Sequence, residues 1–252
     1  MARIVNNKDV FYRFDSDEAY HTWEGTIARM SRPNIKYLGD KVNEHKDVDI
    51  EGIRVKRAVS LFEKSGGQLL KQTKDKGSGK RLSGLFREVL KFDEEHYYPG
   101  LRSVHNGLLT AAGRDLLNGF DFNPHSDPGV VMGNSYTLDL KKGVLCLHDF
   151  SPGLLLSKTT NVSQLRVRFL LSRVDFLLGE FITFMSKEKV FTPEDPKQDL
   201  RLKVGKRPQT DGLDIAYLWI GFERDDAVAV PKLLWRADDV FRVVGGPHPN
   251  LQ

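Results

Sequence analysis

The chain of 252 residues has a single cysteine, Cys146, and seven histidines that are scattered along the sequence. One cysteine excludes an internal disulfide framework and every metal site that is built from several cysteines. The sequence also lacks the run of ~18 apolar residues that a membrane-spanning helix needs, and its first residues do not form a signal peptide. We therefore expect no membrane insertion and no Sec-dependent export, so that the chain is cytoplasmic when it is made. A final place in an extracellular or phage-like particle stays open.

The motifs of the common catalytic and cofactor sites are also missing. The stretch Gly77–Lys80 lacks the first glycine and the final Ser or Thr of a phosphate-binding loop. Asp121–Asp127 lacks the glycine and the closing glutamate of a calcium loop, and no HExxH or G-x-S-x-G motif occurs. Cys146 and His148 share one face of a predicted strand, but that face would be the outer surface of a sheet. We expect a protein that is not an enzyme, with no catalytic residue, no cofactor and no metal site.

Aromatic and other apolar residues are plentiful enough for a substantial core. The sequence has 15 Phe, 7 Tyr and 3 Trp, and 40% of its residues are apolar, which excludes a wholly disordered chain. The sequence pattern divides the chain into an N-terminal arm (1–50), a helical domain (51–119) and a β-sandwich domain (120–252). The predicted fold class is α+β, with a small N-terminal helical bundle followed by an immunoglobulin-like antiparallel β-sandwich.

The arm combines short apolar stretches with a possible helix. Two of these stretches favour short strands. The residues that we assign to them as an assembly arm are Ile4, Val5, Val10, Phe11, Tyr12 and Phe14. Asp15 and Glu18 are typical of a helix start, and the spacing of the apolar residues after them predicts a helix that Pro33 ends.

The remaining elements are predicted from the spacing of apolar residues. Helical spacing within 55–62, 82–90 and 108–116 predicts three amphipathic helices. Alternating or continuously apolar segments predict seven strands, at 136–140, 144–148, 165–173, 176–185, 213–222, 227–235 and 241–244. The segment 192–212 contains three Pro and two Gly, so we expect a long surface loop there.

The charge of the chain, +4 in total, is unevenly distributed. Residues 15–51 hold nine acidic and five basic residues, a net charge of −4, whereas residues 52–91 hold eleven basic and three acidic residues, a net charge of +8. A basic segment of this kind favours an acidic partner, either nucleic acid or the acidic segment of another copy, although a solvated helix face is equally compatible. The residues that we assign to the basic face are Arg54, Lys56, Arg57, Lys64, Lys71, Lys80, Arg81 and Arg87.

Several stretches resemble a group of uncharacterised Bacteroidota proteins that have a helical N-terminal part, a GFDFN junction and a β C-terminal part. The resemblance spans residues 52–222. It rests on Ala58–Phe62, Leu69–Leu70, Lys80–Leu82, Leu108, the junction Leu116–Asn123 and the strand end Val174–Phe176. The resemblance implies the helical-then-β order, but it brings no activity and no catalytic residue.

These features favour a non-enzymatic structural protein that assembles with copies of itself or docks into a larger particle, such as a filament, a tube or a phage-tail-like particle. An N-terminal arm with short strands can add to the sheet edge of a neighbour. The first alternative is a basic nucleic-acid-associated protein that uses the helices of residues 52–91. The second is an unrecognised enzyme or a sugar-binding sandwich with Trp235 or Tyr217 as a platform, although a core position is favoured for both residues.

Overall fold

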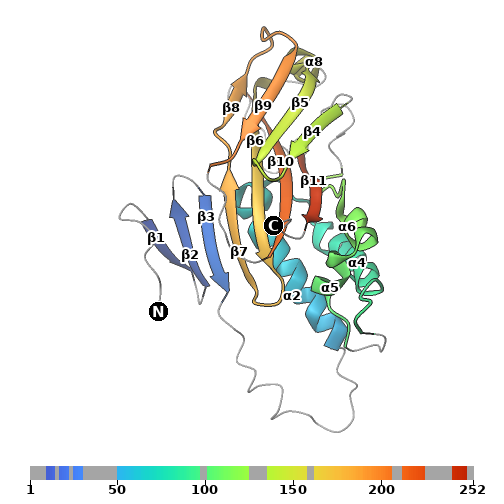
Figure 1. Cartoon of the computed structure of the whole chain (residues 1–252). Helices are drawn as coiled ribbons and strands as arrows, with labels where there is room; N and C mark the ends of the chain where they lie inside the picture. Colours follow the sequence, from blue (N-terminus) through green and yellow to red (C-terminus); the bar gives the residue numbers. More distant parts are fainter. Residues whose placement is uncertain are drawn as a thin grey trace.

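A computed structural model shows an α+β protein with antiparallel sheets (Figure 1). The structure describes residues 10–14, 17–22, 25–30, 50–96, 101–124, 135–157, 162–205, 212–224 and 240–248. The helices are α2 (Ile50–Ser65), α3 (Gly67–Thr73), α4 (Ser78–Leu90), α5 (Val104–Leu109), α6 (Ala111–Leu117) and α8 (Pro152–Ser157). The strands are β1 (Val10–Phe14), β2 (Asp17–Thr22), β3 (Gly25–Met30), β4 (Ser135–Asp139), β5 (Val144–Phe150), β6 (Val162–Asp175), β7 (Glu180–Met185), β8 (Lys189–Phe191), β9 (Gln198–Lys203), β10 (Leu213–Arg224) and β11 (Val240–His248).

The strands form one large and one small sheet. The large sheet has the order β1-β2-β3-β7-β6-β10-β11, and β8 also pairs with β6. Strand β6 is long enough to hold two partners on one side, because Leu165–Val167 pairs with β8 and Leu170–Asp175 pairs with β7. The small sheet has the order β4-β5-β9. Short chain connections explain the antiparallel pairing of β4 with β5 and of β6 with β7.

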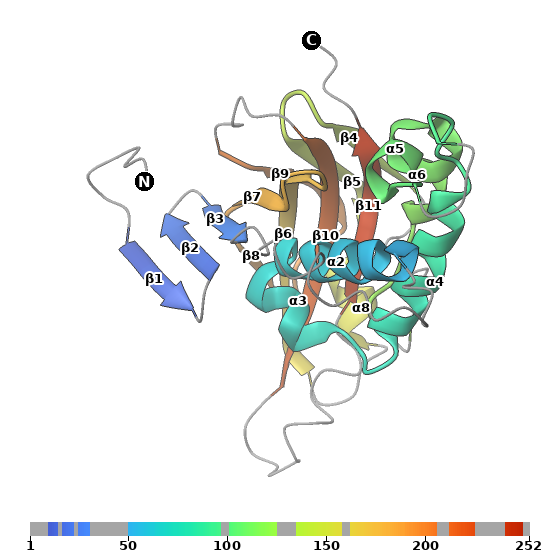
Figure 2. The ribbon, with the colours of Figure 1, turned by 90° about the horizontal axis from the view of Figure 1, so that it is seen from below.

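The two faces of the large sheet are covered by different layers. Helices α2 to α6 lie on one face, as Figures 1 and 2 show, and the small sheet with α8 lies on the other. Strand β10 alternates between these layers. Leu213, Ile215 and Tyr217 belong to the core beneath the helices, whereas Ala216 and Leu218 belong to the core beneath the small sheet. The period of two residues along a strand requires β10 to be apolar on both faces.

An aromatic cluster fills the core between the helices and the sheet. Phe62 of α2 contacts Phe86 of α4 and Tyr217 of β10 edge-on, with ring centroids 5.6 and 5.7 Å apart. Phe122, which follows the helices, lies between Phe62 and Phe241 of β11. All five rings are fully buried. Residues from the helices and from the strands therefore share one core.

Buried hydroxyl groups attach the end of α2 to the sheet. The Ser65 hydroxyl lies 2.8 Å from the hydroxyl of Tyr217. The carbonyl oxygen of Ser65 accepts hydrogen bonds from Ser172 of β6 and Thr183 of β7, at 3.1 and 2.7 Å. This carbonyl belongs to the last turn of α2, where it has no partner within the helix. Gly67, with a φ of 64°, then redirects the chain into α3.

The α+β class is confirmed, but the finer arrangement is not, because the strands β1 to β3 precede the first described helix, α2. The helices do not form a bundle with a core of their own, because Tyr217, Phe241 and other strand residues complete it. An immunoglobulin-like sandwich is likewise not confirmed, because helices cover the large sheet on the face away from the small sheet.

Two local predictions are wrong. The helix expected over 15–30 is instead the strand pair β2 and β3, and β3 pairs with β7, so sheet pairing overrides the helical spacing. The loop expected over 192–212 contains β9, in which buried Leu200 and Leu202 alternate with exposed residues. The alternating pattern of β9 is short and lies among prolines, so the sequence analysis did not identify it as a strand. The strand expected over Val10–Phe14 coincides with β1. The residues Ile4 and Val5 and the predicted strand 227–235 lie outside the described residues.

The buried ion pair between Arg173 of β6 and Asp214 of β10 provides a test of this core. The two side chains are 4% and 2% exposed, and Arg173 Nε donates to Asp214 Oδ1 at 2.8 Å. We expect Asp214→Ala to lower the free energy of unfolding by about 3–5 kcal/mol, because the buried guanidinium loses this carboxylate. Chemical denaturation measures the change.

A second ion pair between the same strands is a matched control. Arg166 and Glu223 are hydrogen-bonded, but their side chains are 38% and 46% exposed. Glu223→Ala should therefore cost less than about 1 kcal/mol. If Asp214→Ala and Glu223→Ala lowered the free energy of unfolding equally, the result would contradict the assignment of the Arg173–Asp214 pair to the buried core.

Candidate functional site

The residues of the predicted basic face lie in different surroundings. Arg54, Arg57 and Lys64 line one pocket beside α2. Arg81 instead donates two hydrogen bonds to the carboxylate of Asp75, at 2.8 and 2.9 Å, and also contacts backbone carbonyl groups of the junction segment. The other members of the basic face are exposed on α2, α3 and α4; they are Lys56, Lys71, Lys80 and Arg87. Arg81 thus has a structural role, and the pocket brings together the three residues on α2.

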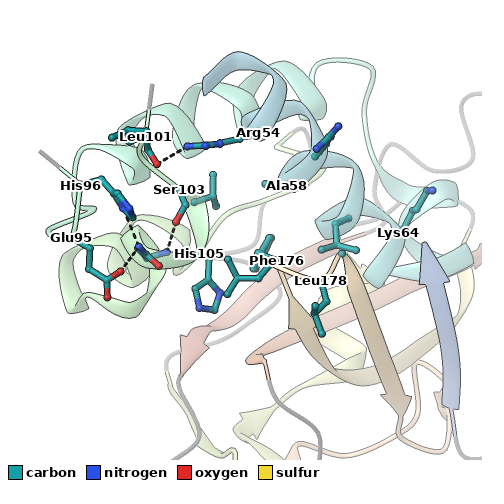
Figure 3. Close-up of a pocket in the computed structure, with 16 residues that line it drawn as sticks. Arg54, Ala58, Lys64, Glu95, His96, Leu101, Ser103, His105, Phe176 and Leu178 are labelled. Atoms are coloured by element: carbon teal, nitrogen blue, oxygen red, sulfur yellow. Dashed lines mark hydrogen bonds between the residues drawn. The ribbon is translucent and has the colours of Figure 1, made fainter. Parts of the chain in front are cut away.

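The pocket has a volume of about 890 Å³ and three walls, which Figure 3 shows. The first wall is one face of α2. The second consists of residues 95–96 and 101–106, at the start of α5, and the third is the turn 176–179 between β6 and β7. A volume of this size is in the range of small-molecule sites.

Helix α2 presents both charge and apolar surface to the pocket. Arg54, Arg57, Leu61 and Lys64 follow one another at intervals of three or four residues, and Ala58 lies four residues after Arg54, which places all five on one side of the helix. Ala58 and Leu61 are buried and form the apolar floor. Arg54 also fixes the second wall, because its guanidinium donates to the carbonyl oxygen of Arg102 at 2.7 Å.

The buried carboxylate of Asp93 organises the second wall. It accepts hydrogen bonds from the backbone N–H groups of Ser103, at 2.7 Å, and Glu95, at 3.0 Å, and it contacts the ring of His96. Burial by itself raises the pKa of Asp93, but these hydrogen bonds outweigh it, and the pKa lies below its usual value. Ser103 in turn caps α5 by accepting a hydrogen bond from the N–H of Asn106.

The third wall gives the pocket an apolar rim. Leu177 and Leu178 are 68% and 49% exposed, and Leu101 of the second wall is 54% exposed. Phe176 is partly buried and packs edge-on against Phe86 of α4. Gly179, with a φ of 72°, closes the turn into β7. Exposed leucines gathered around a hollow are typical of a binding surface.

His105 is a titratable group among the lining residues. Its Nδ1 atom is buried and has no hydrogen-bond partner within the structure as described. Desolvation lowers the pKa of His105, although the charges of Asp175 and Glu95 act in the opposite direction. The imidazole is therefore neutral at pH 7, and it lies next to Phe176 in the close-up of the pocket (Figure 3).

A second candidate surface is the edge of the large sheet. Strands β1, β2 and β3 form an antiparallel meander (residues 10–30) that stands beside β7, away from the helices, in Figures 1 and 2. The meander joins the rest of the large sheet where Gly25–Arg29 pairs with residues 180–184 of β7. Strand β1 lies at one end of the strand order of the large sheet. It contains four residues of the predicted assembly arm.

Cys146 and His148 lie on the outer face of the small sheet, as the sequence predicts, while Leu145 and Leu147 are buried. His148 lies 3.2 Å from the hydroxyl of Thr137 and 3.4 Å from a carboxylate oxygen of Asp199. The types of side chain match a nucleophile, a base and an orienting acid. However, the Asp199 side chain is 71% exposed and the group lies on an open sheet face, whereas such catalysis needs a cleft that excludes water.

The described part of the chain contains no group of three or more His, Cys, Asp or Glu side chains placed to bind a metal ion. It also contains no helix that is both long and apolar enough to span a membrane.

No protein-family model, no curated protein and no solved structure matches this chain.

Sequence reasoning identified the cations of the pocket but not the pocket. Leu177 and Leu178 were expected inside a strand that begins at Phe176, whereas they form the turn before β7. The walls come from segments about 40 and 120 residues away from α2, and only the tertiary packing brings them together. The one local signal was Gly179, because glycine is typical of turns.

The lowered pKa of His105 predicts a pH dependence of stability. The unfolded chain binds a proton to this imidazole more readily than the folded chain does, so stability should fall as the pH drops through ~6.5, the ordinary pKa of histidine. We expect His105→Asn to lose less of its free energy of unfolding between pH 7 and pH 5 than the unmodified protein loses. Urea denaturation at several pH values measures this difference. Parallel pH profiles of the two proteins would contradict it.

Proposed function

We propose that the protein is a non-enzymatic assembly protein whose copies join by strand exchange: the β1–β3 meander of one copy pairs with β7 of the next. The observation that supports this most directly is the pairing of β3 with β7 through a single run of five residue pairs. An added strand gains its affinity from backbone hydrogen bonds, which are the same whichever copy supplies the strand.

The position of the meander in the sequence makes such an exchange feasible. Residues 31–49 separate β3 from α2, and nineteen residues can span at most ~65 Å. The meander can therefore reach β7 of its own chain or of a neighbour without a break in the pairing. Which of the two forms depends on protein concentration and on the length of this connection, as in domain swapping generally.

Exchange between copies also explains why a protein would keep strands outside its main core. Strand β7 contributes Phe181 to the core beneath the helices, and the pairing partner beyond it is β3. Without β3, the edge of β7 would present unpaired backbone groups, which is a hazard for uncontrolled aggregation. A repeated exchange would link copies head to tail into a filament, a tube or a comparable particle, whereas a reciprocal one would give a closed dimer.

A cross-link between two single-cysteine chains tests the exchange. Ile27 and Ile182 are direct partners in the β3–β7 pairing. We would co-express Ile27→Cys and Ile182→Cys in two differently tagged chains, each with Cys146→Ser, and oxidise the purified protein. We expect a disulfide-linked heterodimer on a non-reducing gel, since neither chain can form this bond alone.

Val190→Cys in place of Ile182→Cys is the matched control, because Val190 is an exposed residue of β8, which pairs with β6 and not with β3. A heterodimer with Val190→Cys at the same yield would mean random collision. Absence of the heterodimer in a protein that light scattering shows to be oligomeric would overturn strand exchange. A monomer at all concentrations would overturn the assembly function.

The alternative, a nucleic-acid-associated protein, is favoured by the exposed cations of the helices. Lys56, Lys71, Lys80 and Arg87 are all exposed, whereas Arg81 is held by Asp75. If these cations bind phosphate groups, affinity for DNA or RNA should fall steeply between ~50 and ~200 mM salt. A fluorescence-anisotropy titration at both salt concentrations measures this, and absence of binding at ~50 mM salt excludes the alternative.

A further inference from the structure

We infer that the pocket between α2, the start of α5 and the β6–β7 turn binds a small amphipathic anion, an organic acid with an apolar body. This inference goes beyond the proposed assembly function and does not depend on it. Three properties of the pocket support it: its apolar rim, its excess of cationic side chains, and an unpaired polar atom within it.

The apolar rim accounts for the body of the ligand. Leu101, Leu177 and Leu178 come from two different walls and are all about half exposed or more. Each would leave water if a hydrocarbon chain lay between them, and burial of apolar area stabilises by roughly 25 cal/mol per Å². The floor beneath them, formed by Ala58 and Leu61, is buried and apolar. The rim and the floor together therefore offer apolar surface to the body of the ligand.

Charge accounts for the acid group. Arg54, Arg57 and Lys64 line the pocket, and Glu95 is the carboxylate among the lining residues. Glu95 accepts a hydrogen bond from the side chain of Asn106 at 2.8 Å. Arg54 is engaged with backbone carbonyl groups of the second wall, whereas the exposed Arg57 is placed to meet a carboxylate at the mouth. Guanidinium groups bind carboxylates through paired hydrogen bonds.

His105 adds a polar contact inside the pocket. Its Nδ1 atom is buried without a hydrogen-bond partner in the described structure, which is an unfavourable state that a ligand relieves if the ring rotates toward the pocket. A neutral imidazole can accept or donate one hydrogen bond at this position, according to its tautomer. A hydroxyl or carboxyl group of the ligand would satisfy it.

A small molecule fits this site better than a protein segment does. The volume of about 890 Å³ lies within the range of small-molecule pockets. The walls close on the site from three directions, whereas a docked helix or strand needs a groove that is open at both ends. The cations lie along α2 on one wall and the exposed leucines on the other two, so one short amphipathic molecule can contact both.

Three probes with the same ten-carbon chain separate the role of charge from that of apolar surface. They are decanoate, decan-1-ol and decyltrimethylammonium, each used below its micelle concentration. Binding to the full chain would be measured by isothermal titration calorimetry. We expect saturable binding of one decanoate per chain, weaker binding of the alcohol and none of the cation. No saturable binding of decanoate, or equal binding of decanoate and decyltrimethylammonium, would overturn the inference.

Charge reversal on two neighbouring residues of α2 locates the site. Arg57 lines the pocket, whereas Lys56 is exposed and does not line it. We expect Arg57→Glu to weaken decanoate binding about ten-fold or more and Lys56→Glu to weaken it less than about two-fold. An equal loss of decanoate affinity in the two variants would overturn the inference, because it would indicate attraction by the overall charge alone. Both positions are exposed, so the unfolding midpoint of each variant should stay that of the unmodified protein.

The outcome is distinguishable from that of the strand-exchange test. Arg57→Glu should leave the oligomeric state and the cross-linking yield between Ile27→Cys and Ile182→Cys chains unchanged. Decanoate binding by a protein that does not form the cross-link would support the pocket and overturn the exchange, and the reverse result would overturn the pocket alone.

Discussion

Strand β10 belongs to two hydrophobic cores at once, and both covering layers depend on its register. Ile215 and Tyr217 face the helices, whereas Ala216 and Leu218 face the small sheet. A slip of one residue against β6 would move each set to the opposite face. The buried Arg173–Asp214 pair joins β6 to β10, and the two residues are direct partners in the register. The central strands therefore fix the position of every layer outside them.

The hydroxyl groups around Ser65 transmit that register to the helices. Tyr217, Ser172 and Thr183 come from three different strands and meet the same residue of α2. Trp219 makes a similar bond to Thr73 of α3. Buried hydrogen bonds of this kind are directional, so they set the rotation and axial position of α2 more closely than apolar packing alone does. The same rotation places Arg57 at the pocket while Lys56 stays outside it.

The sequence predicted most of what depends on local periodicity and little of what depends on pairing. The double-sided apolar pattern of β10 and the helical spacing of Val55–Phe62 were enough to locate these elements. Residues 15–30 have apolar side chains at helical spacing, but pairing with β7 selects strands instead. The pocket was beyond sequence reasoning, because its walls meet only after the β6–β7 turn and the start of α5 are packed against α2.

The β6–β7 hairpin connects the two proposed surfaces. Its turn, residues 176–179, lines the pocket, and the strand that follows pairs with β3. Thr183 of that strand is also bonded to Ser65, so the hairpin is held to α2 between the two surfaces. A rigid connection of this kind means that substitutions in the hairpin would disturb both surfaces together. Changes on the exposed side of α2 affect the pocket alone, and for this reason Arg57, rather than Leu177 or Leu178, separates ligand binding from assembly.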